Sequence, residues 1–115
     1  MIIGTREVGH VTVFDVEGEI RRSDSPEMTI HQLVKSRLEA GRTDILLNCE
    51  KVDFIDSFGV GEILASYIST QNMGGKLKLS MVSPKLLLIF QVTMLTRVLE
   101  IFGSEKAALE SFGKP

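Results

Sequence analysis

The sequence has little of what several classes of protein depend on. Its 115 residues include one cysteine, Cys49, so an internal disulfide is excluded. Thirteen basic residues against fifteen acidic ones leave a net charge of -2, without the basic excess usual in proteins that bind nucleic acid. The longest strongly apolar run, residues 86–90, is far too short to cross a bilayer. We therefore expect no direct contact with nucleic acid and no membrane insertion.

The N-terminus lacks the basic and then apolar pattern of a signal peptide. Apolar residues make up 43% of the chain and charged residues 24%, a composition that argues against disorder. A chain of 115 residues suits one domain and can bury a core without metal or disulfide. We expect a single cytoplasmic domain over residues 1–115, a monomer or weak dimer that needs no cofactor and no metal.

Hydrophobic periodicity predicts the strands. Residues 2–16 predict a β-hairpin whose second strand is ended by Gly18. The continuous apolar run of residues 45–47 is typical of a strand that is buried on both faces of a parallel sheet. Residues 76–81 alternate between polar and apolar, which predicts a strand with one wetter face, and residues 98–102 predict a short last strand.

Capping residues predict the helices between these strands. Ser25 followed by Pro26 predicts the first helix start, because serine caps helices and proline is tolerated at the first helical position. Ser83 with Pro84 repeats this pattern, and Ser104 caps a last helix. The second helix carries an apolar stripe of Val60, Ile63, Leu64, Tyr67 and Ile68. The order predicts an α/β fold: a central mixed sheet of four or five strands with an N-terminal hairpin and about four helices, mostly on one side.

Residues 53–64 lie between the buried strand and the second helix, where open α/β sheets tend to place binding sites. Ser57 falls at or next to the predicted helix N-cap. In one interpretation Ser57 only caps the helix and Gly59 only relieves a tight turn. In the other, the free N–H groups at the helix N-terminus allow a phosphate on Ser57 without loss of the helix.

The same segment argues against nucleotide-binding and hydrolytic enzymes. Gly59 and Gly61 follow a strand and precede a helix, as in a dinucleotide-binding loop, but Leu64 stands in the place of the third glycine. The chain has neither a Gly-Lys-Ser/Thr phosphate loop nor a Gly-x-Ser-x-Gly nucleophile elbow. We therefore expect that the protein is not an enzyme.

The histidines and aspartates give no catalytic pattern either. His10 falls in the hairpin turn and His31 on the first helix, and neither has a sequence reason to approach Ser57. Asp53 and Asp56 could suggest a metal or phospho-aspartate site, but no acidic pair follows the first strand to complete it. We interpret the histidines as structural and expect no metal at the aspartates.

The stretch Asp56-Ser57-Phe58-Gly59-Val60-Gly61 resembles the motif of the STAS family, which includes the bacterial anti-sigma factor antagonists. The usual motif there is Asp-Ser-Ser/Thr-Gly, followed by an apolar residue and another small one. Three further landmarks stand in family order: Gly18-Glu19-Ile20 after the second strand, Gly74-Gly75 before the fourth, and Ser83-Pro84 at the third helix. The resemblance implies a STAS-like domain over the whole chain.

The resemblance also implies a partner-switching regulator. In the family, the unphosphorylated antagonist binds a kinase-type anti-sigma factor and thereby frees the sigma factor. Phosphorylation of the serine after the motif aspartate breaks this binding, and a phosphatase restores it. That serine matches Ser57 here. The alternative is a STAS scaffold or interaction module of a larger signalling assembly, which is not phosphorylated.

Two positions depart from the usual family pattern. Phe58 replaces a second serine or threonine, and it could anchor a partner, hinder a kinase or simply pack. Arg21 replaces the aspartate that commonly follows the second strand, as a solvated loop charge or as a contact to an acidic partner. We expect this loop and the start of the second helix to form one partner-binding surface. Its expected residues are Arg21, Asp24, Asp56, Phe58, Gly59 and Glu62.

Overall fold

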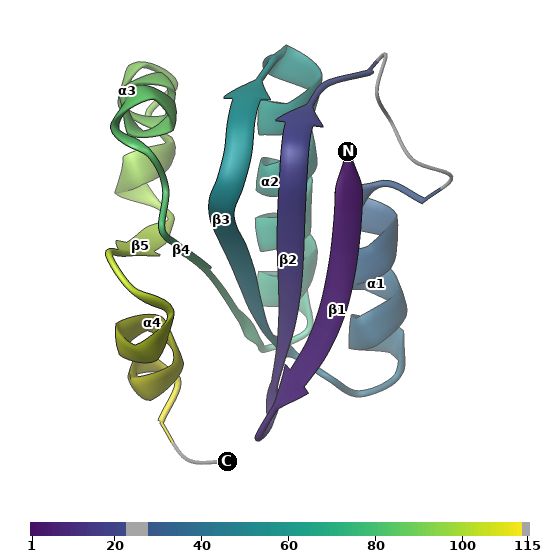
Figure 1. The fold of residues 1–115 in the computed structure, drawn as a ribbon. Coiled ribbons are helices and arrows are strands. Elements are labelled where there is room, and N and C mark those ends of the chain that lie inside the picture. The colour runs from purple at the N-terminus through teal and green to yellow at the C-terminus, as the bar shows by residue number, and fades with distance from the viewer. Residues whose placement is uncertain (23–27, 114–115) are drawn as a thin grey trace.

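A mixed five-stranded sheet forms the centre of the fold (Figure 1). The structure, a computed structural model, describes residues 1–22 and 28–113. The strands, in the same order along the chain and across the sheet, are β1 (Ile2–Val8), β2 (Val11–Ile20), β3 (Asp44–Ile55), β4 (Lys76–Ser80) and β5 (Glu100–Phe102). β1 and β2 pair antiparallel, and the other neighbours pair parallel. The predicted hairpin and mixed sheet are confirmed.

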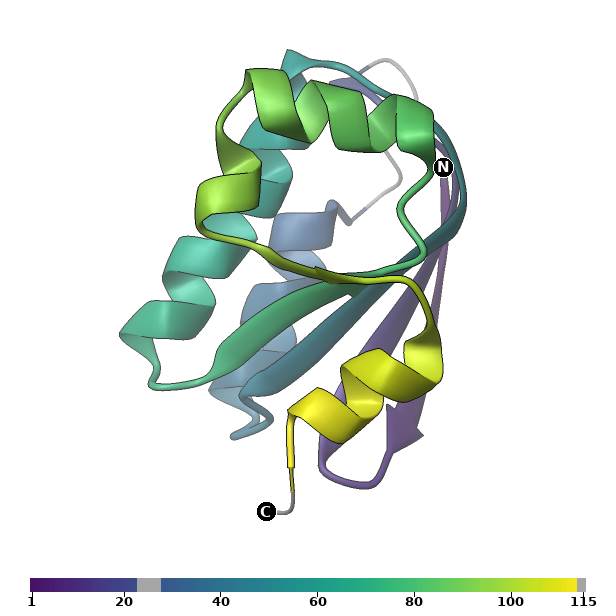
Figure 2. The ribbon, with the colours of Figure 1, turned by 90° about the vertical axis from the view of Figure 1, so that its left-hand side faces the viewer.

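Helices cover both faces of this sheet, unequally (Figure 2). The helices of the described residues are α1 (Ile30–Glu39), α2 (Ser57–Asn72), α3 (Pro84–Val92), the 3-10 helix η2 (Leu95–Arg97) and α4 (Glu105–Ser111). The buried hydrophobic residues of α1, α2 and α3 belong to one core cluster, whereas that of α4 belongs to a second cluster on the opposite face. The prediction of helices mostly on one side is confirmed. No helix of the described ranges is both long and apolar enough to span a membrane.

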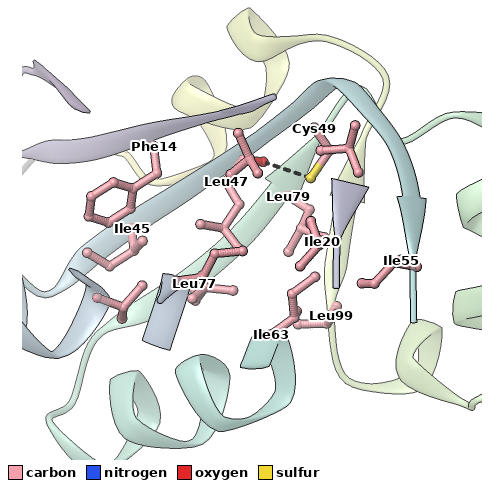
Figure 3. Close-up of a cluster of buried hydrophobic side chains, with 14 of the residues drawn as sticks. Phe14, Ile20, Ile45, Leu47, Cys49, Ile55, Ile63, Leu77, Leu79 and Leu99 are labelled. Carbon is pink, nitrogen blue, oxygen red and sulfur yellow. Dashed lines mark hydrogen bonds between the residues drawn. The ribbon is translucent and has the colours of Figure 1, made fainter. Parts of the chain in front are cut away.

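β3 lies in the middle of the sheet, and the continuous apolar run of residues 45–47 predicted a strand that is buried on both faces. Ile45, Leu46 and Leu47 are each 0% exposed. Figure 3 shows Leu47 and Cys49 in the larger core cluster, with the Cys49 thiol 3.8 Å from the carbonyl oxygen of Leu47. Cys49 is 1% exposed, so this side chain is a small core residue, as predicted. The same burial raises the pKa of its thiol to about 12.

Serine caps define the starts of α3 and α4, as predicted. The Ser83 hydroxyl accepts a hydrogen bond from the Leu86 N–H at 3.2 Å, and Pro84 follows in the first turn. The Ser104 hydroxyl accepts from the Ala107 N–H at 3.1 Å. Both helices therefore begin where the local sequence satisfies their first N–H groups.

The first helix begins later than predicted. α1 starts at Ile30, because Thr29 and Gln32 form a capping box. The Thr29 hydroxyl accepts a hydrogen bond from the Gln32 N–H, and the Gln32 side chain accepts one from the Thr29 N–H. The predicted start at Ser25 and Pro26 is wrong for this helix, and those two residues lie outside the described part of the chain.

The second strand also extends further than predicted. Gly18 does not end β2, which continues to Ile20. Gly18 has φ of 97° and lies at a shift in the register between β2 and β3. A glycine can take this left-handed conformation within a bulge, so the strand bends there and goes on.

The predicted wetter face of β4 is wrong. Lys78 is 4% exposed and Ser80 is 0% exposed. The Lys78 ammonium donates hydrogen bonds to the carbonyl and hydroxyl oxygens of Ser111 and lies over the rings of Phe102 and Phe112. The alternating pattern correctly predicted a strand. However, α4 covers the second face of β4, and the periodicity of a strand does not show which elements pack on that strand.

α2 faces the sheet with smaller residues than predicted. Its buried residues are Gly59, Ile63, Ser66 and Thr70. Leu64 and Ile68, both members of the predicted apolar stripe, are 37% and 49% exposed. A face of glycine, serine and threonine lets the helix approach the sheet closely, and this approach sets the position of its first turn.

Candidate functional site

The start of α2 lies at the end of the sheet where β2 and β3 finish (Figure 1). Asp56 is the N-cap, and its carboxylate oxygen Oδ1 accepts a hydrogen bond from the Gly59 N–H at 2.9 Å. Ser57 is the first helical residue and is exposed. Within the described residues, the Ser57 hydroxyl has no hydrogen-bond partner. Ser57 is therefore next to the N-cap, and the capping role belongs to Asp56.

Gly59 holds this turn against the ends of two strands. A Cβ atom at Gly59 would lie 2.4 Å from the carbonyl oxygen of Ile20 and 2.6 Å from Cγ1 of Ile55. The Asp56 N–H donates to the same Ile20 carbonyl at 3.2 Å. The glycine is needed for close packing, since no residue with a side chain fits this space. The position of Ser57 is thus fixed relative to β2 and β3.

The described end of the loop after β2 contacts this turn. The Arg22 N–H donates to Asp56 Oδ2 at 3.3 Å, and the Arg22 guanidinium carbon lies 4.9 Å from the centroid of the Phe58 ring. Arg21 instead pairs with Glu19 at 2.7 Å. Asp24 lies outside the described residues.

Arg22 is the site residue that sequence reasoning did not assign. The sequence shows two neighbouring arginines, Arg21 and Arg22, and no sequence pattern indicates which of the two contacts α2. The backbone contact to Asp56 makes that distinction.

Glu62, one turn further along α2, contacts α1. Its carboxylate accepts a hydrogen bond from the His31 N–H at 3.1 Å, which satisfies one of the free donors at the start of α1. The His31 ring lies 2.9 Å from the Ser69 hydroxyl, and the His10 ring lies 3.1 Å from Asp44. Both histidines have structural partners, as predicted, and Glu62 links the two helices.

A second polar cluster lies beside α4 on the other face of the sheet. Arg6 donates to Asp15 at 2.6 Å and to Glu105, and Asn48 donates to Glu105 at 3.1 Å. Hydrogen bonds to Asp15 and then Glu105 raise the pKa of Arg6, and the hydrogen bond from Arg6 lowers the pKa of Glu105. These residues line a cavity of about 430 Å³ together with Val16, Glu17, Glu50, Lys51 and Met81. Since the Arg6 cluster is paired internally, we interpret it as the link between α4 and the hairpin.

The described ranges contain no group of three histidine, cysteine, aspartate or glutamate side chains placed to bind a metal ion. The fold and the site together define an α/β protein with a mixed sheet, an N-terminal hairpin and an Asp-Ser helix start at the end of the central strand. The chain belongs to the STAS family, because the STAS domain model matches residues 3–108.

Solved structures with the same fold come from different bacteria. One, assigned as an anti-sigma factor antagonist of Thermotoga maritima, is 24% identical with a TM-score of 0.83, over 96% of this chain and 93% of that one. The anti-sigma factor antagonist SpoIIAA, unphosphorylated, is 22% identical with a TM-score of 0.74, over 96% of each chain. The phosphorylated form of SpoIIAA from Bacillus is 23% identical with a TM-score of 0.74, over 96% of this chain and 98% of that one. At these identities the likeness establishes the fold.

Proposed function

We propose that the protein is an anti-sigma factor antagonist, a partner-switching regulator controlled by phosphorylation of Ser57. Unphosphorylated, it binds a kinase-type anti-sigma factor; phosphorylated, it releases that partner until a phosphatase restores the serine. The observation that carries the proposal is the exposed Ser57 hydroxyl, which follows the Asp56 cap in the family motif. In this scheme the kinase and the phosphatase carry out the catalysis, and the antagonist itself is not an enzyme.

The geometry at Ser57 suits a phosphate that alters binding and leaves the fold intact. The kinase would transfer the γ-phosphoryl group of ATP to Ser57 Oγ, with loss of the hydroxyl proton and release of ADP. The phosphate adds about −1.5 to −2 charges at the first position of α2, where the helix dipole favours negative charge. The packing of Gly59 on Ile20 is independent of this charge. The modification would therefore change the interface through its charge and size.

We assign the partner-binding surface to the start of α2 and the loop that follows β2. Arg22 contacts Asp56 and Phe58 there, and Arg21 directly follows the last residue of β2. Gly59 is buried and contributes by holding the turn in place. Glu62 contributes as the link to α1, and Asp24 belongs to the same loop in the sequence.

Incubation with ATP and the kinases of its own cell is expected to add one phosphate to the intact protein, located by tandem mass spectrometry on Ser57. The Ser57→Ala variant should gain none under the same conditions. If the modified residue is Ser23 or Ser25 instead, or if no kinase of that cell modifies the protein, the Ser57 switch is wrong. The scaffold function, in which binding does not depend on phosphate, then takes its place.

Arg21→Glu is expected to weaken binding of the anti-sigma factor roughly tenfold, because it reverses a charge at the proposed interface. Its melting temperature should stay close to that of the parent, since Arg21 is partly exposed and exposed ion pairs contribute little to stability. Lys106→Glu, an exposed charge reversal on α4, is the matched control and should bind as the parent does. Equal binding by Arg21→Glu would remove the loop from the interface.

A further inference from the structure

Arg22 contacts the residues on both sides of Ser57. Its backbone N–H donates to the Asp56 carboxylate, which precedes Ser57, and its guanidinium lies over the ring of Phe58, which follows it. The backbone contact fixes where the arginine side chain begins. The guanidinium at the other end of the side chain reaches the ring of Phe58, in the first turn of α2.

The charge of Arg22 has no carboxylate partner among the residues that the structure describes. Other arginines of the chain are paired: Arg6 with Asp15 and Glu105, and Arg21 with Glu19. Arg22 is exposed, and its guanidinium makes its one described contact with the half-buried Phe58 ring. Among the described residues, no side chain accepts a hydrogen bond from its five N–H donors, which match the oxygens of an anion.

A phosphate on Ser57 would compete with the ring for this guanidinium. Cation–π contacts at exposed positions are weak, whereas arginine and phosphate form charge-assisted, often bidentate hydrogen bonds. We infer that Arg22 binds the phosphate on Ser57, and that its guanidinium thereby leaves the Phe58 ring. This inference rests on the proposed phosphorylation and concerns how this chain responds to it.

Two properties of the surface would then change together. In the unmodified protein the surface presents a positive charge stacked on an aromatic ring. In the phosphorylated protein the phosphate neutralises the positive charge, and the Phe58 ring is uncovered. A partner whose acidic groups contact Arg22 would lose that contact in addition to meeting the phosphate. Phe58 therefore binds the Arg22 guanidinium by a cation–π contact in the unmodified protein.

The test uses protein in which phosphoserine is incorporated at position 57 during synthesis, so that no kinase is needed. Phosphorus NMR then measures the second pKa of the phosphate in the parent sequence and in Arg22→Gln. A bound guanidinium favours the dianion and lowers this pKa, so Arg22→Gln should titrate roughly 0.2 to 0.7 pH units higher. Arg21→Gln is the matched control, and the second pKa of its phosphate should equal that of the parent. Equal titration of the parent and Arg22→Gln would overturn the inference, as would an equal effect of Arg21→Gln.

A proton NMR measurement follows the ring contact directly. In the unmodified protein the ring current of Phe58 should shift the Arg22 δ protons upfield, and Phe58→Leu gives the value without a ring. Phosphoserine at position 57 should move these protons toward that value, and an unchanged shift would contradict release from the ring. Because phosphoserine is incorporated during synthesis and no kinase is used, failure of these measurements leaves the kinase experiment standing. Failure of the kinase experiment likewise leaves this titration interpretable.

Discussion

Gly59→Ala is expected to lower the free energy of unfolding by about 3 kcal/mol, although alanine forms helices better than glycine does. The added Cβ would lie 2.4 Å from the carbonyl oxygen of Ile20 and 2.6 Å from Ile55. The first of these contacts is to the backbone of the last residue of β2, which cannot move aside as the end of a flexible side chain can. The whole first turn of α2 must therefore shift away from the sheet.

Gly61→Ala is the matched control for this substitution. Gly61 lies two residues further along the same helix, and nothing lies within 4 Å of a Cβ atom built there. Its replacement should raise the free energy of unfolding by up to about 1 kcal/mol, because only the helix propensity changes. Urea denaturation of both variants measures the difference. If Gly59→Ala proves as stable as Gly61→Ala, the close packing at Gly59 does not position the helix.

The two glycines show how one motif combines different physical roles. Gly59 is required by packing, whereas Gly61 is exposed and has space for a Cβ atom. Asp56 supplies the cap, and Ser57 is left with an exposed hydroxyl. The motif thus builds a rigid turn that presents one serine. These residues are neighbours in the sequence, and only their contacts show that Gly59 and Asp56 hold the turn in place while Ser57 is exposed.

The features that local pattern determines could be predicted from the sequence. The element order, the hairpin, the buried central strand and the serine caps of α3 and α4 are confirmed. Each depends on neighbours within a few residues: an apolar run, an alternation or a cap. The position of Ser57 beside a helix cap belongs to the same group.

The features that depend on distant segments could not be predicted. Lys78 is buried because α4 returns to cover β4, and Leu64 stays exposed because Gly59 and Ser66 face the sheet instead. At the site, the contact of Arg22 with Asp56 joins residues 34 positions apart. Periodicity and capping patterns each describe one segment of the chain, so they cannot predict contacts between distant segments.

Ser57→Ala should fold as stably as the parent, within about 0.5 kcal/mol, and bind the anti-sigma factor whether or not the kinase is active. The reason is that Asp56 caps α2, and the Ser57 hydroxyl has no hydrogen bond within the described residues to lose. Urea denaturation measures the stability, and calorimetry with the purified partner measures the binding. A loss of binding in this variant would mean that the hydroxyl itself is part of the interface.

Ser57→Asp should retain the fold and lose at least about tenfold in affinity, which is about 1.4 kcal/mol. A carboxylate at the first position of α2 gains about 0.3–1 kcal/mol from the helix dipole, while its charge beside Asp56 opposes an interface built for a neutral serine. Ser104→Asp is the matched control, because it also places aspartate at a helix start, on α4 at the other end of the molecule (Figure 1). It should bind as the parent does. If Ser57→Asp binds equally well, charge at Ser57 does not control the interface, and the protein acts as an unswitched scaffold.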